Sequence, residues 1–211
     1  MNFFDDLNKL NQGTEDNEFS DLNSKVYDEH DYILDEKHNP EFFKALCEFC
    51  KHEKIHYNIN GFTQKDLNQI TYIDSDMFAK SYFQDVTSLD ELQYFNNLEI
   101  LDNYTFSSCQ KLKSIILPKN LKEIRNNVFY CCTSLKEIII PNSVEKIDYN
   151  AFQWCTRLKK VIIQNNIKFI TTPCFGKCIS LEKIVIPKKF KDNINKIFCD
   201  TDLSKVDITY I

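Results

Sequence analysis

The sequence has very little glycine and proline. Its 211 residues include three Gly and five Pro, about 4% of the chain where roughly 12% is usual. So few glycines exclude a Gly-rich phosphate loop, a collagen-like repeat and a flexible Gly-rich linker. The four His residues lie in the first third of the chain, and no nucleophile stands beside a recognisable base. We therefore expect a protein that is not an enzyme and uses no cofactor.

Long hydrophobic runs are also absent. Apolar clusters such as Ile138–Ile140 are far shorter than the roughly 20 residues that cross a bilayer, so we expect no membrane insertion. Residues 1–6 carry acids where a secretory signal has basic residues before an apolar core. Nine cysteines, an odd number, then favour reduced thiols and a cytoplasmic location.

The charges are distributed unevenly along the chain. Residues 1–105 contain 22 acidic and 8 basic residues, whereas residues 106–211 contain 9 acidic and 18 basic residues. Such a division can reflect nothing more than two differently solvated surfaces. It can also indicate a basic face for an anionic partner, an acidic tail that screens that face, or head-to-tail association between copies. Basic repeats with Trp154 and Tyr130 could suit a nucleic acid, but the net charge of −5 argues against that partner.

A repeat of 23 residues dominates the second half of the chain. Phenylalanine recurs at this interval from Phe83 onwards, and cysteine, leucine and aliphatic residues follow each Phe at fixed distances. The Phe column is Phe106, Phe129, Phe152, Phe175 and Phe198; the Cys column is Cys109, Cys132, Cys155 and Cys178; the Leu column is Leu112, Leu135, Leu158 and Leu181. A unit of this length cannot bury its own apolar side, so successive units must stack around one continuous core.

Each unit contains the signals of a short strand and two bends. The pattern Leu-x-x-Ile-x-Ile predicts strands that align in parallel from coil to coil, and Pro118, Pro141 or Pro187 ends them. The Phe-x-x-Cys segment closes the coil as a turn or short helix. Asn or Asp at the bend before Phe tolerates left-handed backbone in place of glycine; these residues are Asn126, Asn127, Asp148 and Asn150.

This repeat closely resembles the BspA-type leucine-rich repeat. The residues from Phe129 to Pro141 follow that family's Phe-x-x-Cys-x-Ser-Leu-x-x-Ile-x-Ile-Pro pattern, and Ala151 and Phe152 complete the unit. The resemblance implies a leucine-rich-repeat solenoid, a β-rich α/β fold whose parallel sheet of 23-residue coils carries a helical N-terminal cap. It also implies protein binding or adhesion, with the cell surface as an alternative location.

The chain departs from the family pattern in two places. The usual Gly after the last Ile of the unit is Arg125, Asp148 or Thr171. The final unit appears one residue shorter between Phe198 and Leu203, which predicts a terminal strand over Ile208–Ile211.

The sequence predicts three segments. Residues 1–38 form an acidic, partly disordered segment, residues 39–82 a helical cap, and residues 83–211 the repeats. In the cap, Asn39 and Pro40 are good start signals for a helix reaching about Lys54. Thr63 and Asp66 predict a second, short capped helix.

The cysteines invite two chemical hypotheses. Cys47, Cys50, His52 and His56 could supply zinc or redox chemistry, but at about 100° per residue on one helix they do not share a face. We therefore favour core positions for Cys47 and Cys50. The Cys column would stack at strand spacing, close enough for disulfides, yet as an inward column it is better interpreted as buried reduced thiols. Cys131, Cys174 and Cys199 lie outside the column and are expected to be the exposed or reactive ones.

The outward face of the strands is the candidate binding surface. The residue between the last two core aliphatics is branched and apolar in every coil, which predicts an exposed stripe of Ile116, Ile139, Ile162 and Val185. A charged column flanks it, made of Glu137, Lys160, Lys183 and Lys205. The alternative is that branched residues only favour strands and that the N-terminal segment covers the stripe.

These patterns predict a non-enzymatic binding module that recognises a protein through its open sheet face. A second hypothesis is a structural protein that self-associates through its oppositely charged halves. A zinc or thiol-redox protein acting through Cys47 and Cys50 is the third.

Overall fold

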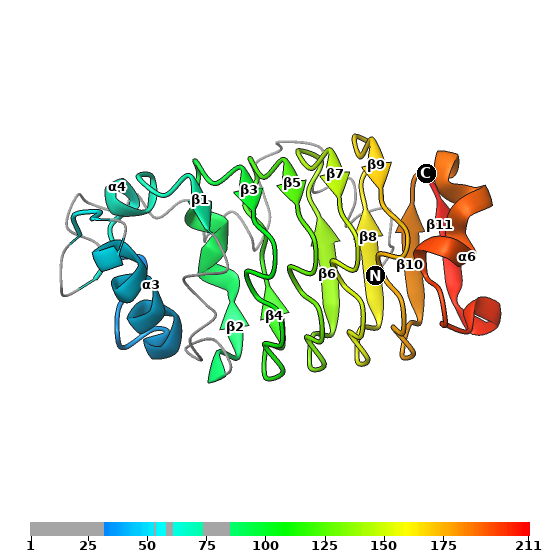
Figure 1. Cartoon of the computed structure of the whole chain (residues 1–211), viewed down its shortest axis with the longest axis horizontal. Helices are drawn as coiled ribbons and strands as arrows, with labels where there is room; N and C mark the ends of the chain where they lie inside the picture. Colours follow the sequence, from blue (N-terminus) through cyan, green and yellow to red (C-terminus); the bar gives the residue numbers. More distant parts are fainter. Residues whose placement is uncertain (1–31, 53, 58–60, 74–84) are drawn as a thin grey trace, which may run out of the picture. The chain divides into compact units, whose positions relative to one another are not determined.

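The computed structural model describes residues 32–52, 54–57, 61–73 and 85–211, of which the His52 side chain is not described. Tyr32–Ile211 forms one compact unit, shown in Figure 1. None of the described helices is long and apolar enough to cross a bilayer. The N-terminal elements are α3 (Pro40–His52), α4 (Gln64–Leu67) and β1 (Tyr72–Ile73).

The repeats build a stack of coils with two main parallel sheets. One sheet has the order β1-β3-β5-β7-β9 and the other β11-β10-β8-β6, while β2 and β4 pair separately. The first sheet contains β3 (Ile100–Leu101), β5 (Glu123–Ile124), β7 (Lys146–Ile147) and β9 (Phe169–Ile170). The second contains β6 (Glu137–Ile140), β8 (Lys160–Ile163), β10 (Lys183–Ile186) and β11 (Asp207–Tyr210); the short pair is β2 (Ser88–Leu89) and β4 (Ser114–Ile115). The predicted leucine-rich-repeat solenoid is confirmed.

The strand register keeps the 23-residue period through the regular coils. Glu137 aligns with Lys160, and Lys160 with Lys183. The first coils are longer, since Tyr72 aligns with Ile100 and Ser88 with Ser114. Lys183 aligns with Asp207, so the last coil is one residue longer than the regular coils, not shorter as the Phe198 to Leu203 spacing suggested. The helical turns η3 (Lys188–Asn193) and α6 (Ile194–Ile197) come before Phe198, which is still 23 residues after Phe175, so the extra residue lies after Phe198, in the segment that contains η4 (Leu203–Lys205). The predicted terminal strand is present as β11.

The third side of each coil is also hydrogen-bonded to its neighbour, although it is built from turns. The backbone N–H groups of Asn127, Phe129 and Cys131 donate to the carbonyls of Tyr149, Ala151 and Gln153 at 3.0, 2.7 and 2.9 Å. The same three-bond pattern joins the coil before, from Tyr104, Phe106 and Ser108. This ladder explains how the Phe-x-x-Cys segment closes the coil without a strand.

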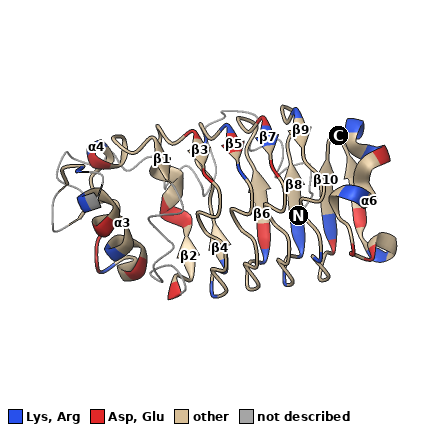
Figure 2. Ribbon diagram, in the orientation of Figure 1, with Lys and Arg blue, Asp and Glu red and all other residues tan. Residues whose placement is uncertain are grey.

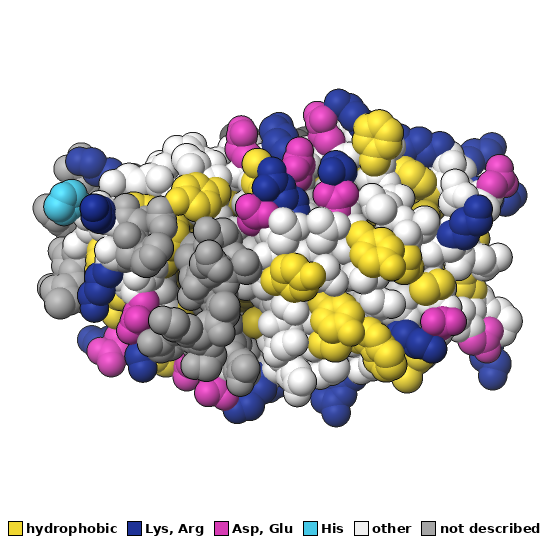
Figure 3. Space-filling view, in the orientation of Figure 1, with side chains coloured by type: hydrophobic (Ala, Val, Ile, Leu, Met, Phe, Trp, Pro, Cys, Tyr) yellow, Lys and Arg dark blue, Asp and Glu magenta, His cyan; other side chains and the backbone are white. Residues whose placement is uncertain are grey.

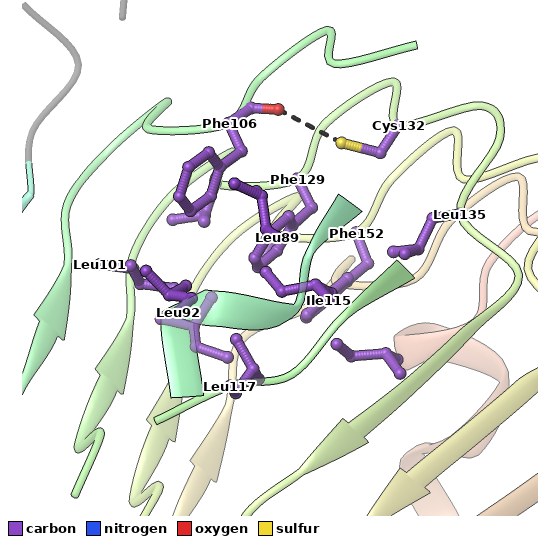
Figure 4. Packing of buried hydrophobic residues seen from close by; sticks show 14 of the residues in the cluster. Leu89, Leu92, Leu101, Phe106, Ile115, Leu117, Phe129, Cys132, Leu135 and Phe152 are labelled. Carbon is purple, nitrogen blue, oxygen red and sulfur yellow. Dashed lines mark hydrogen bonds between the residues drawn. The ribbon is translucent and has the colours of Figure 1, made fainter. Parts of the chain in front are cut away.

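Stacked phenylalanines fill the interior. Ring centres of successive Phe residues from Phe106 to Phe198 lie 5.5, 5.1, 4.7 and 4.9 Å apart, with the rings nearly parallel. All five are buried, and Figure 4 shows Leu and Ile side chains around the first three, Phe106, Phe129 and Phe152. Phe83, which the sequence placed first in this column, lies outside the described residues.

The cysteine column joins neighbouring coils by hydrogen bonds. The Cys132 thiol donates to the carbonyl oxygen of Phe106 at 3.2 Å, the contact drawn in Figure 4. Cys155 and Cys178 bind the carbonyls of Phe129 and Phe152 in the same way at 3.3 Å. Cysteine therefore packs as a small apolar residue and also satisfies a buried carbonyl of the preceding coil.

Helix α3 begins at Pro40, as the sequence predicted. Asn39 accepts a hydrogen bond from the Phe42 N–H at 3.4 Å, and its amide donates to Ser88 O and Glu91 Oε2 at 3.0 and 2.9 Å. The helix-capping residue thus also connects the cap to the first coil. α4 carries the predicted capping box between Thr63 and Asp66.

Two boundaries of the cap differ from expectation. α3 ends at His52 rather than about Lys54. The sequence placed Leu34 in the acidic segment, but Leu34 is fully buried and forms an isolated antiparallel β-bridge with Phe62. Residues 32–38 therefore pack with the cap. The rest of that segment, residues 1–31, lies outside the described residues.

We expect Phe152→Ala to reduce the free energy of unfolding by about 3–5 kcal/mol, because the substitution opens a cavity in the stack. Phe169→Ala is the matched control, since Phe169 is 65% exposed and should cost little. Urea melts of both variants check this. A loss below about 1 kcal/mol for Phe152→Ala would contradict the stacked core.

Candidate functional site

The predicted apolar stripe is in register but is not exposed throughout. Ile139 aligns with Ile162, and Ile162 with Val185. Ile116 is 39% exposed and Ile139 is half-buried, whereas Ile162 and Val185 are 2% and 0% exposed. The expectation of four solvent-facing residues is therefore wrong for Ile162 and Val185.

The position of β8 and β10 as inner strands of the four-stranded sheet does not explain this burial, because neighbouring strands lie beside a residue in the plane of the sheet and do not cover its outward side chain. Ile162 and Val185 also lie outside the cluster of buried core residues. The sequence carried no signal of this burial, since Ile115–Leu117 and Ile138–Ile140 are apolar runs like Val161–Ile163 and Ile184–Ile186, and Ile116 is exposed. The alternative that residues 1–38 cover the stripe falls mainly on residues outside the described part.

The charged column beside the stripe is present, but one of its four predicted residues is a different one. Glu137 is exposed, and Lys160 and Lys183 are half-buried in register with it. Asp207, not Lys205, takes the last position, and its carboxylate lies 3.8 Å from the Lys183 ammonium. Lys205 is exposed in η4 instead. The last coil is one residue longer than the 23-residue repeat, whereas the prediction assumed that it was one residue shorter.

Charges also run along the first sheet, where acidic and basic residues alternate from coil to coil. The alternating column consists of Glu99, Lys122, Glu145 and Lys168. Its Lys168 and Glu145 form an ion pair at 2.7 Å, and Arg125 binds Asp102 at 3.1 Å nearby. Figure 2 shows these charges along the upper margin of the repeats and a second set along the lower margin.

The third side of the coils has a different composition. We define the turn face as the outward columns of the four turn segments 103–110, 126–133, 149–156 and 172–179. From Asn103 to Ile179, Lys177 is the only charged residue in these columns. The remaining members include four aromatic residues, six amides and five hydroxyls; the aromatic ones are Tyr104, Tyr130, Tyr149 and Trp154. Figure 3 shows hydrophobic side chains scattered over an uncharged band between two charged rims.

Several turn-face residues have left-handed backbone. Asn127 and Asn150, at φ of 57° and 58°, confirm the predicted bend, whereas Asn126 and Asp148 do not have positive φ. The column of Asn127 and Asn150 also holds Tyr104 at 62°, and a second left-handed column holds Ser108, Cys131, Trp154 and Lys177 at 63°, 59°, 65° and 61°. A bulky aromatic residue in this region is an outlier, because its Cβ crowds the backbone. The sequence analysis missed this feature, although the shared 23-residue spacing of Tyr104 and Asn127 was visible.

A shallow hollow of about 610 Å³ lies beside the first coils. It is lined by Thr71, Tyr72, Asn96, Asn97, Glu99, Ile100, Asn120 and Lys122. Two of its amides are already engaged, since Asn97 Nδ2 donates to Asn68 O and Asn120 Nδ2 to Asn96 O, both at 2.7 Å. These two side-chain nitrogens are therefore already used within the protein.

The buried cysteines are chemically quiet. Burial raises the pKa of Cys50, Cys109 and Cys178 to about 12, and it also raises the pKa values of Cys132, Cys155 and Cys174. Cys174 is fully buried, so its expected exposure is wrong; Cys131 and Cys199 are half-buried. The nine thiols are free.

Cys47 and Cys50 occupy the buried side of α3, as the core interpretation requires. In the part of the chain that the structure describes, no three His, Cys, Asp or Glu side chains come together as metal ligands. The side chain of His52, which the zinc hypothesis used, is not among the described atoms.

Comparison with known proteins identifies the repeat. A family model described as "BspA type Leucine rich repeat region (6 copies)" matches residues 76–204. A leucine-rich-repeat protein of T. pallidum is 27% identical, with a TM-score of 0.42 over 46% of this chain and 50% of that chain. One from Bacteroides ovatus is 26% identical, with a TM-score of 0.47 over 56% of this chain and 31% of that chain. The matched region thus spans half or less of either protein, and no curated protein matches.

We expect thiol titration of the native protein at pH 8 to label Cys131 and Cys199 quickly and the other seven slowly. A thiol with a pKa of about 12 is about 0.01% thiolate at that pH, and the thiolate is the reactive form. In denaturant without reductant, all nine thiols should react. Recovery of a single thiol, with four disulfides mapped by mass spectrometry, would contradict the reduced cysteine column.

Proposed function

The chain belongs to the BspA-type leucine-rich repeat family, and on this basis we propose that it is a non-enzymatic module that binds another protein. The family is generally non-catalytic, and its stacked coils supply a rigid, extended surface. The free, buried thiols support a reducing, cytoplasmic location; the cell surface is the family-based alternative.

The exposed part of the sheet face supports this function best. Ile116 is 39% exposed. Half-buried Ile139 lies on the same outward side of β6 as exposed Glu137. Apolar side chains presented by a rigid strand, with charged residues at the edge, have the composition of a protein interface. Since Ile162 and Val185 are buried, the binding surface is limited to β4 and β6 and to the charged residues beside them, including Lys160 and Lys183.

We expect Ile139→Asp to keep the fold and to abolish capture of the protein partner, whereas Ile138→Asp should unfold the chain. Ile138 is 1% exposed and points into the coil. Ile179→Asp is the matched surface control, because Ile179 is 68% exposed on the turn face. Affinity capture compared by mass spectrometry, with circular dichroism of each variant, measures both effects.

Two outcomes would contradict this assignment. Unfolding by Ile139→Asp would mean that the outward side of β6 is misassigned by one residue. A folded Ile139→Asp variant that captures the same proteins as the wild-type chain would place the interface elsewhere.

Self-association is the second candidate function, supported by the charge at the end of the last coil. Lys188, Lys189, Lys191 and Lys196 are exposed there, and none is paired with an acidic side chain of the described residues. A basic end and a first half with 22 acidic residues have opposite charges, which favours head-to-tail contact between copies.

If this second function is correct, the measured mass should fall as salt rises. The screening length decreases from about 30 Å at 0.01 M to about 8 Å at 0.15 M, which weakens contacts between exposed charges. Light scattering across this range tests it, and Lys188→Glu with Lys189→Glu should remove the association. A monomer of constant mass at high concentration contradicts self-association.

A further inference from the structure

The turn face is a second surface with its own chemistry, distinct from the sheet face proposed above. We propose that it binds a neutral polysaccharide, with aromatic rings stacking on the sugar rings and amides hydrogen-bonding to the sugar hydroxyls. The proposal goes beyond the protein-binding function and does not depend on it.

The near absence of charge is the first argument. Charged residues make up 27% of the chain, yet Lys177 is the only one on the turn face between Asn103 and Ile179. A charge that loses its water without gaining a counter-charge is costly. A surface without charges therefore suits a ligand without charges. It does not suit a nucleic acid or an acidic glycan, which need basic side chains.

The polar residues that remain form the second argument. Asparagine and glutamine carry both a donor and an acceptor, and serine and threonine hydroxyls can act as either. Sugar hydroxyls have the same dual character, so alternating amides and hydroxyls can pair with them in many orientations. The amides include Gln110 and Gln153, and the hydroxyls include Thr133 and Thr156. Asn126 Nδ2 already donates to Asn103 Oδ1 at 2.8 Å.

Exposed aromatic rings are the third argument. Tyr104, Tyr149 and Trp154 are 55%, 45% and 41% exposed. The ring face carries partial negative charge, which attracts the partly positive C–H groups on the flat side of a pyranose. Lys177 Nζ lies 5.9 Å from the centre of the Trp154 ring and 3.3 Å from Asp200 Oδ2, which orients the indole.

Two of these aromatic residues are kept in strained backbone. Tyr104 and Trp154 have positive φ, where asparagine or glycine would cost less. Their N–H groups are held to Asn126 O and Gly176 O at 2.9 and 2.8 Å, so the coil stack maintains the conformation. Strain of this kind concentrates at functional sites, and Tyr104 is the clearer case, because Asn127 and Asn150 occupy the equivalent positions of the next two coils. The Trp154 column is left-handed in each coil, at Ser108, Cys131 and Lys177 as well, so there the turn itself sets the backbone.

The spacing of the coils fits a polymer better than a single sugar. Successive coils repeat at about 4.8 Å, close to the length that one pyranose unit adds to an extended chain. The four turn segments therefore present four backbone positions in a row, with Tyr104, Tyr130, Tyr149 and Trp154 each in a different column. Protein interfaces are enriched in aromatic residues and also in arginine and methionine. The turn face has the aromatic residues but no Arg or Met, and Ile179 is its one exposed aliphatic residue, so its uncharged polar composition, rather than its rings, favours a sugar.

Trp154 is the only tryptophan of the chain, so its fluorescence reports on this surface directly. We expect at least one of cellotetraose, xylotetraose, mannotetraose and chitotetraose to change the emission of the full chain in a saturable way. Calorimetry of the same titration gives the affinity. No saturable response to any of the four neutral probes overturns the proposal, as does tighter binding of tetragalacturonate, an acidic chain of equal length.

Variants separate binding from folding. Tyr104→Asn places in this column the residue that Asn127 and Asn150 already provide, so the fold should persist while affinity falls about tenfold or more. Trp154→Gly, measured by calorimetry, removes both ring and strain and should lose binding without loss of thermal stability. Phe169→Ala, an exposed aromatic residue on β9, is the matched control and should bind as the wild type does.

Unchanged affinity in both turn-face variants would show that the sugar binds elsewhere and would overturn the proposal. If no saccharide binds and the two variants instead lose a captured protein, the turn face is a protein interface and the proposal is wrong. The sheet-face variant Ile139→Asp should leave sugar binding intact, so this proposal and the proposed function can fail separately.

Discussion

Coil-to-coil stacking at one fixed spacing is the constraint on which the rest of this structure depends. The phenylalanine rings lie 4.7–5.5 Å apart, which matches the separation of hydrogen-bonded strands. The same spacing therefore satisfies the aromatic stack, both parallel sheets and the ladder along the turns. No coil can bury its apolar side alone, so the stability of each unit comes from its neighbours. Asn39 and the last helical turns η3 and α6 close the two ends.

The interior of the coils was predictable because it repeats. Phe152, Cys155 and Leu158 mark columns whose 23-residue interval requires stacking, and their inward direction follows from the strand pattern. The outer faces were predictable only in part. Ile116 and Ile139 are accessible as expected, but alternation along a strand does not report whether its outer side meets solvent. The continuous apolar runs of β8 and β10 did not supply that information either, because Ile115–Leu117 and Ile138–Ile140 have the same form and Ile116 is exposed.

The last coil and the turns escaped prediction for different reasons. Counting from Phe198 to Leu203 assumed that Leu203 was a strand-side core residue, yet it lies in η4 and is half-buried. The one-residue extension then places Asp207 opposite Lys183. The hydrogen-bonded ladder along the turn segments was not predicted, because it is formed by backbone groups of left-handed residues and leaves no periodic hydrophobic pattern in the sequence. Only their composition, neutral in a charged chain, distinguished them.

The three sides of the coil divide the chemistry between them, and the backbone explains how. On the two sheets, residues of successive coils lie side by side, so opposite charges can pair across the repeat, as Glu145 and Lys168 do. Such exposed pairs contribute about 0–1 kcal/mol each and mainly keep these faces soluble. On the turn side, left-handed positions cost about 1–2 kcal/mol for any residue other than Gly, and less for Asn. Asn127 and Asn150 follow this preference, and Tyr104 departs from it in the same column. The second left-handed column holds Ser108, Cys131, Trp154 and Lys177, none of which is Asn or Gly. The N–H group of each of these four residues donates to a carbonyl of the next coil, so coil stacking, rather than local residue preference, stabilises the backbone that carries the Trp154 ring.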